Sequence, residues 1–166
     1  MSPELFWIPG PWRGRLAVAA RPRGGDWLAD EASGWRQAGI DVVVSLLEGD
    51  ALVDEPKAAL ANGIRFISFP IPDRGVPASA AAAFSLIADI SDALERGQHV
   101  AVHCRQTLGR SGRIAAAVLA HAGIDPELAI EVVSSARGQA VPETPEQRLW
   151  LQLAPSAPPI LLKAES

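Results

Sequence analysis

The segment 100–112, VAVHCRQTLGRSG, constrains the fold of this chain more than any other stretch of its sequence. Its apolar run ends at His103 and Cys104, so the only cysteine among 166 residues lies where a buried strand would pass into a loop. Arg110 and Ser111 follow this loop. A loop between a strand and a helix turns successive backbone N–H groups inward and forms an anion site at the positive end of the helix. The segment therefore predicts an oxyanion-binding loop that carries a thiol.

The residue types in this loop suit nucleophilic attack. Facing a guanidinium, the thiol of Cys104 would ionise more readily and would be placed to attack a bound oxyanion. The planar fork of Arg110 can bond two phosphate oxygens at once. The alternatives are a buried structural cysteine, a surface helix arginine and, for Ser111, the N-cap of a helix that begins at Gly112. The position of Cys104 between a buried strand and a Gly-Arg-Ser-Gly helix start favours the nucleophile.

Periodic segments predict an α/β fold with a single domain over residues 1–154 and a proline-rich C-terminal tail over 155–166. Short apolar runs predict strands at 16–20, 41–47, 64–69 and 99–103. Helical spacing, prolines and terminal glycines predict helices at 26–38, 55–61, 77–96, 112–121, 126–136 and 145–153. Strands that alternate with helices indicate a mainly parallel central sheet of about four to five strands, covered by helices on both faces. The thiol loop would then lie at the carboxyl end of a strand, the usual place for a ligand in such sheets.

Composition limits the partners and the compartment. With 48% hydrophobic and 20% charged residues the chain is globular, and a net charge of −4 gives no basis for general binding to nucleic acid or to anionic membranes. The single cysteine excludes an intramolecular disulfide, and the N-terminus shows no signal-peptide pattern, so we expect a cytoplasmic protein. Polar residues interrupt the longest apolar run, 76–94, which predicts an amphipathic helix and no membrane span. The oligomeric state stays open.

The motif His103-Cys104, five residues, then Arg110-Ser111 resembles the HC-x5-R-[ST] signature of protein tyrosine phosphatases, most closely their small dual-specificity-like members from bacteria. The resemblance extends to the segment 69–77, to Arg137-Gly138 and to the segment 141–147 in the family's order, and it spans roughly positions 40 to 150. It implies a phosphatase-like fold and hydrolysis of phosphotyrosine, with phosphoserine and phosphothreonine as further substrates, through a phosphocysteine intermediate.

The resemblance also implies roles for individual residues. Cys104 would attack phosphorus, and Ser111 would donate a hydrogen bond to the sulfur and ease its departure from phosphocysteine. His103 would order the loop through hydrogen bonds. Gln147 either positions the hydrolytic water or lies on a solvated helix, and the sequence does not decide between the two. The phosphate-binding loop would comprise Arg105, Gln106, Thr107, Leu108, Gly109 and Arg110.

Asp73 is the predicted general acid, because the leaving oxygen needs a proton that a thiolate cannot provide. The candidate carboxylates upstream are Glu48, Asp50, Asp54, Glu55 and Asp73. Only Asp73 is expected in a loop after a strand, bracketed by prolines and a glycine, and it lies 31 residues before Cys104, similar to the spacing in dual-specificity relatives. The alternative is a turn aspartate that caps its own backbone.

The predicted chemistry uses no cofactor and no metal. His99 and His103, four residues apart, would share a face of one strand, but no further ligand set accompanies them. The five tryptophans are expected to pack in the core instead of stacking on a substrate; they are Trp7, Trp12, Trp27, Trp35 and Trp150.

Thr107 departs from the family pattern, which has glycine at this position of the loop. A β-branched residue tolerates unusual backbone angles poorly and would crowd the phosphate, although its hydroxyl is a further donor. Two alternative functions therefore stay open: a phosphate-binding module with impaired catalysis, and a rhodanese-like sulfurtransferase, which would leave Asp73 and Ser111 without roles. Arg105 adds positive charge at the rim, so the substrate is a phosphoprotein or another phosphomonoester such as a phosphorylated lipid or nucleotide.

Overall fold

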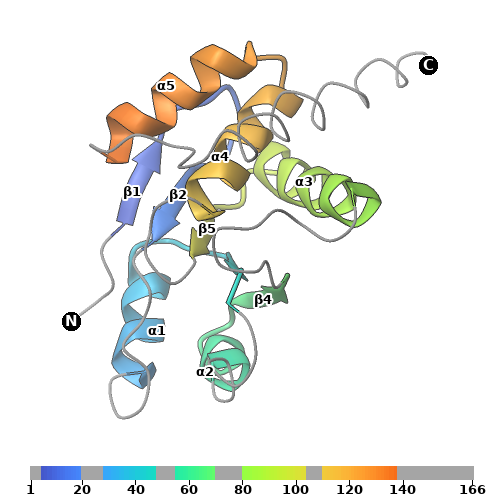
Figure 1. The fold of residues 1–166 in the computed structure, drawn as a ribbon. Helices are drawn as coiled ribbons and strands as arrows, with labels where there is room; N and C mark the ends of the chain where they lie inside the picture. Colours follow the sequence, from blue (N-terminus) through green and yellow to red (C-terminus); the bar gives the residue numbers. More distant parts are fainter. Residues whose placement is uncertain (1–4, 20–27, 48–54, 70–79, 104–109, 138–166) are drawn as a thin grey trace.

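The computed structural model describes residues 5–19, 28–47, 55–69, 80–103 and 110–137. Within them one sheet has the strand order β1-β2-β5-β3-β4 (Figure 1). The edge strand β1 runs antiparallel to β2, and the other neighbouring strands are parallel. The bounds are β1 Leu5–Ile8, β2 Leu16–Ala19, β3 Val42–Ser45, β4 Arg65–Ser68 and β5 Val100–His103. The predicted α/β fold with a mainly parallel sheet is confirmed.

Helices lie on both faces of this sheet, as Figure 1 shows. Helices α3, α4 and α5 contribute to one core cluster, and α1 and α2 contribute to a second cluster on the opposite face. Helix bounds are α1 Leu28–Gln37, α2 Glu55–Ala61, α3 Ala80–Glu95, α4 Arg110–His121 and α5 Pro126–Arg137. The helix expected at 145–153, the predicted tail and residues 77–79 lie outside the part of the chain that is described.

The central strands are apolar on both faces because each face is covered. In β3, Val42 and Val44 belong to the cluster with α3, α4 and α5, whereas Val43 belongs to the cluster with α1 and α2. Ala101 of β5 lies on the same face as Val43. Side chains alternate along a strand with a period of two, so every second residue of β3 and β5 is directed toward α1 and α2.

The predicted helix ends agree with the structure where turn chemistry determines them. Gly39 follows α1 with φ of 93°, and the N–H of Ile40 closes the turn on the carbonyl of Trp35 at 3.0 Å. At the start of α5, the carboxylate of Asp125 accepts hydrogen bonds from the N–H groups of Glu127 and Leu128, at 3.1 and 3.3 Å. Asp125 is therefore the N-cap that the Asp-Pro pair predicts.

Strand β1 was not predicted from the sequence. Its four residues pair with β2 from Leu5 opposite Ala19 to Ile8 opposite Leu16. Three of the four are only partly buried, and so short a run without alternation between polar and apolar residues carries little strand signal. The strand is stabilised by its hydrogen bonds to β2, which the sequence of β1 alone does not predict.

Candidate active site

The carboxyl ends of four strands meet at one edge of the sheet. His103 lies opposite Ala19 on one side and Ser45 on the other, and Ser45 lies opposite Ser68. Beyond the last pairs, the N–H of Leu46 donates to the carbonyl of His103 at 3.0 Å. The segments that follow β2, β3, β4 and β5 therefore all begin at this edge. This is where ligands bind in sheets with parallel strands.

His103 is directed toward α1 and α2, because it stands two residues after Ala101 in β5. Its side chain is fully buried. Nε2 shares a hydrogen bond with Oε2 of Glu55, the first residue of α2, across 2.6 Å. Glu55 is itself only 3% exposed, so the pair is screened little by water.

Trp35 of α1 covers the imidazole from a second direction. The two rings are stacked, with centroids 6.0 Å apart and an interplanar angle of 22°. Trp35 is fully buried. In the described structure Nδ1 of His103 has no hydrogen-bond partner. One ring nitrogen and one ring face of His103 are thus fixed, while the nitrogen nearer the main chain is free to bond.

Helix α4 begins at Arg110, and six residues separate it from the end of β5. Ser111 and Arg113, in the first turn, are both fully buried. Because the helix begins at Arg110, Ser111 lies inside its first turn, and the alternative of an N-cap for a helix starting at Gly112 is wrong. Backbone N–H groups in the first turn of a helix carry partial positive charge, which favours an anion.

Other predicted site residues fall outside the described residues, and their roles stay predictions. They are Cys104, Arg105, Gln106, Thr107, Leu108, Gly109, Asp73 and Gln147. His99 does not share a site with His103. It precedes β5 at the opposite end, where its Nδ1 accepts a hydrogen bond from the N–H of Arg15 at 3.0 Å. In the part of the chain that is described, no three His, Cys, Asp or Glu side chains form a group that could hold a metal ion.

Sequence comparison identifies the family. Residues 17–124 match the sequence profile of a family described as "Polymorphic toxin system, DSP-PTPase phosphatase". The chain belongs to this family. The matched region contains His103, Arg110 and Ser111 together with β3, β4, β5 and all of β2 except its first residue. No significant match was found among curated proteins.

Solved structures of phosphatases share the fold of this family member. Tk-PTP in its active form is 27% identical with a TM-score of 0.78, over 92% of this chain and 97% of that chain. Kinase associated phosphatase, with its catalytic-site cysteine replaced by serine, is 20% identical with a TM-score of 0.77, over 91% and 93%. PTPMT1 is 20% identical with a TM-score of 0.76, over 96% and 98%. The chain is a phosphatase of the DSP-PTPase family with the corresponding fold.

Two residues of this corner were not identified from the sequence. Glu55 was only one of five candidates for the general acid. Its burial against His103 makes it unsuited to protonate a leaving group in solvent contact. Trp35 was expected to pack in the core, which is confirmed, but not to stack on His103. The usable signal was the period of two in β5, which directs His103 toward the helices on the Ala101 side.

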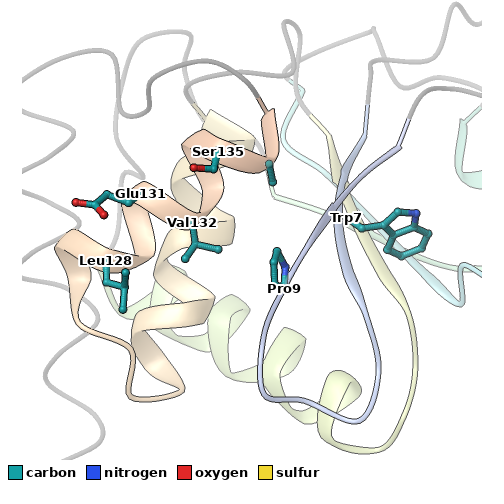
Figure 2. A pocket seen from close by; sticks show the side chains of 7 residues that line it. Trp7, Pro9, Leu128, Glu131, Val132 and Ser135 are labelled. Atoms are coloured by element: carbon teal, nitrogen blue, oxygen red, sulfur yellow. The ribbon is translucent and has the colours of Figure 1, made fainter.

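An open groove lies away from this edge, between the edge strand and α5 (Figure 2). Its volume is about 510 Å³. Trp7 and Pro9 line it on the side of the sheet, and Leu128 and Val132 line it on the side of α5. Trp7 is therefore partly exposed, whereas Trp12 is buried like Trp35. Trp27 and Trp150 are not among the described residues. Across the described helices, none is both long and apolar enough to span a membrane.

Proposed function

We propose that this phosphatase is a cysteine-dependent phosphomonoester hydrolase that dephosphorylates phosphotyrosine, with phosphoserine and phosphothreonine as further substrates. One observation carries the proposal. His103 ends β5 at the ligand-binding edge, Arg110 begins α4, and the six residues between them contain the only cysteine of the chain. A short strand-to-helix connection of this kind forms an anion site.

In the proposed reaction, the thiolate of Cys104 attacks phosphorus and forms a P–S bond while the P–O bond to the leaving alcohol or phenol breaks. Asp73 donates a proton to the departing oxygen. Water then attacks phosphorus and gives a proton to the carboxylate of Asp73, the P–S bond breaks to restore the Cys104 thiolate, and inorganic phosphate leaves. Arg110 and the loop amides stabilise the charge on the equatorial oxygens in both transition states. Gln147 is the proposed residue that orients the water.

The topology supports the assignment of Asp73. The segment that contains Asp73 follows β4, and β3 alone separates β4 from β5. At about 4.8 Å per strand spacing, the ends of β4 and β5 lie roughly 10 Å apart. Ser68 and His103 both stand at the level of Ser45, so the two segments start from the same edge. Five residues from Ser68 to Asp73 are enough chain to cross that distance.

Turnover of p-nitrophenyl phosphate by wild type and Cys104→Ser tests the reaction. We expect the serine variant to lose turnover and to keep binding inorganic phosphate, because the loop amides and Arg110 bind without the sulfur. A phosphate-binding module would show binding but no turnover in wild type. A sulfurtransferase would transfer sulfur from thiosulfate to cyanide and leave the phosphoester intact. Near-wild-type hydrolysis by Cys104→Ser would refute the mechanism.

The physiological substrate needs a separate experiment. One of the similar solved structures is PTPMT1 in complex with PI(5)P, and Arg105 adds a cation to the proposed loop. We propose phosphoproteins as substrates, and parallel assays on phosphotyrosine peptides, phosphothreonine peptides and phosphoinositides decide the class. Higher kcat/KM on phosphoinositides than on every peptide would replace this proposal.

The family description supplies a biological setting for the proposal. It names polymorphic toxin systems, and we propose that this phosphatase acts within such a system. The cytoplasmic location expected from the sequence stays a prediction. Expression in bacterial cells tests the setting: growth inhibition by wild type but not by Cys104→Ser is expected, and equal growth of both strains would contradict it.

A further inference from the structure

A buried carboxylate holds the imidazole next to the proposed nucleophile, and the mechanism above does not use it. Glu55 is 3% exposed, His103 is fully buried, and Oε2 lies 2.6 Å from Nε2. Removal of a carboxylate from water is costly unless a partner compensates for the lost hydration. A buried glutamate at position 55 therefore lowers the stability of the fold unless its partner compensates, which suggests that it has a function.

The polarity of the pair is set by the covalent structure of histidine. Glu55 bonds to Nε2, the ring nitrogen far from the main chain, and Nδ1 is nearer the backbone that continues into Cys104. The carboxylate thus lies on the far side of the ring, and Nδ1 lies on the side of the main chain. A hydrogen-bond donor or positive charge beside a thiol favours its ionised form.

Three elements around this end of the sheet carry buried charged side chains. In the described residues these side chains are Glu31 in α1, Glu55 in α2 and Arg113 in α4. Glu55 makes a hydrogen bond to the His103 ring. Trp35 occupies the stacked face of the ring and brings no charge. The carboxylate of Glu55 is therefore placed to orient and polarise the imidazole.

We propose that Glu55 is a positioning residue for the active-site thiol: by holding Nε2 of His103, it fixes the imidazole that precedes Cys104 and makes the thiol more reactive. The proposal rests on the proposed function only in taking Cys104 as the nucleophile. Nδ1 of His103, without a partner in the described structure, is the atom left to bond toward the loop. Glu55 does not touch the substrate.

Alkylation by iodoacetamide tests this role without any phosphatase substrate. The chain has one cysteine, so the rate of mass gain reports Cys104 alone. We expect Glu55→Gln to raise the pH midpoint of alkylation by about one unit, the lower end of the effect of a nearby charge on an ionising group. The kcat for p-nitrophenyl phosphate should fall in parallel at neutral pH, with KM nearly unchanged.

Ala59→Gly is the matched control on the same helix. Ala59 is fully buried in α2 and makes no side-chain hydrogen bond, so glycine weakens the helix and leaves the Glu55 carboxylate in place. We expect a lower Tm and an unchanged alkylation midpoint. If Ala59→Gly shifts the alkylation midpoint as much as Glu55→Gln does, the role of Glu55 is only structural. If Glu55→Gln folds and its midpoint is unshifted, the proposal is wrong.

A measurement on wild type covers the case in which Glu55→Gln does not fold. The ¹⁵N spectrum of the three imidazoles, assigned with His99→Gln and His121→Gln, reports which nitrogen of His103 carries hydrogen. Nε2–H is expected at every pH at which the protein is folded. A neutral ring protonated only at Nδ1 would refute the proposal. An unreactive Cys104 without turnover in wild type would instead refute the proposed function.

Discussion

Trp35 and His103, 68 residues apart in the sequence, stack with ring centroids 6.0 Å apart and planes inclined by 22°. The contact joins α1 to the end of β5 directly before the proposed nucleophile. Trp35 is fully buried and belongs to the cluster that holds α1 and α2 on the sheet. The same ring therefore serves the core and the candidate site.

Trp35→Ala should lower the free energy of unfolding by about 3–5 kcal/mol, the usual cost of removing a large aromatic side chain from a core. Trp35→Phe keeps an aromatic face against His103 and should cost less. Urea unfolding measures both. The pH midpoint of Cys104 alkylation separates packing from orientation, and Trp35→Phe should leave this midpoint near that of wild type. Equal losses of unfolding free energy in Trp35→Ala and Trp35→Phe would contradict a role for the stacked rings.

Most of the fold could be predicted from the sequence because local signals and the global arrangement agree. Val42 to Val44 form a continuous β-branched run, which is typical of a strand covered on both faces. Gly39 and Asp125 mark helix termini through backbone conformation and capping, which depend on few neighbouring residues. Strand β1 could not be predicted because its stability comes from its partner β2 and not from its own pattern.

The candidate site was predictable in its order along the chain and not in its three-dimensional contacts. The spacing of His103, Arg110 and Ser111 can be read directly from the sequence. In the structure His103 ends β5, and Arg110 and Ser111 begin α4. The bond from His103 to Glu55 spans 48 residues and depends on how α2 packs against the sheet. A difference of two residues in the helix start also decided the position of Ser111, which lies in the first turn instead of capping it.

Asp73→Asn should slow phosphoryl transfer about 10²–10⁴-fold for substrates with poor leaving groups, the usual scale of general acid catalysis. Alkyl phosphates need a proton on the departing oxygen, whereas a nitrophenol leaves as an anion. Single-turnover rates on a phosphoserine peptide and on p-nitrophenyl phosphate measure the difference. An equal loss on both substrates would mean that Asp73 acts through structure.

Thr107→Gly should raise kcat/KM if the β-branched residue strains the loop or narrows the anion site, because glycine lets the amides converge on the transition-state oxygens. If the hydroxyl is a useful donor, Thr107→Gly should lose activity and Thr107→Ser should keep most of it. Kinetics of wild type and both variants on one substrate distinguish the two cases. Unchanged kinetics in both variants would show that position 107 is neutral.

Gly14→Ala should destabilise the fold, because a Cβ atom on Gly14 would lie 1.9 Å from the carbonyl oxygen of Gln98. This neighbour is backbone, so it cannot rotate away, and the N–H of Gly14 is already bonded to the carbonyl of Leu94 at 2.8 Å. We expect a loss of at least about 1–3 kcal/mol in urea unfolding, the typical cost of overpacking.

Gly63→Ala is the comparison for Gly14→Ala. A Cβ atom there meets nothing within 4 Å, but the residue has φ of 73°, so only the backbone conformation resists the substitution. Its expected cost is about 1–2 kcal/mol. If Gly14→Ala proves as stable as wild type, the close approach between Gly14 and Gln98 does not constrain the fold.

His121 should make stability fall as the pH is lowered. Burial lowers the pKa of His121 below its ordinary value of 6.5, and the charge of Asp92 opposes this effect. The unfolded chain therefore takes up a proton near pH 6.5, while the folded protein does so only at lower pH. Between these two values the unfolded state binds more protons, so the free energy of unfolding rises with pH through that window and is lost on acidification.

His121→Gln should flatten this part of the pH profile, because the titrating group is gone. Asp92→Asn should steepen it, since loss of the nearby negative charge leaves burial unopposed and lowers the pKa of His121 further. Urea unfolding at about pH 7.5 and about pH 5.5, on either side of the ordinary imidazole range, measures the difference for each protein. Equal differences in wild type and in His121→Gln would exclude His121 as the source of the pH dependence.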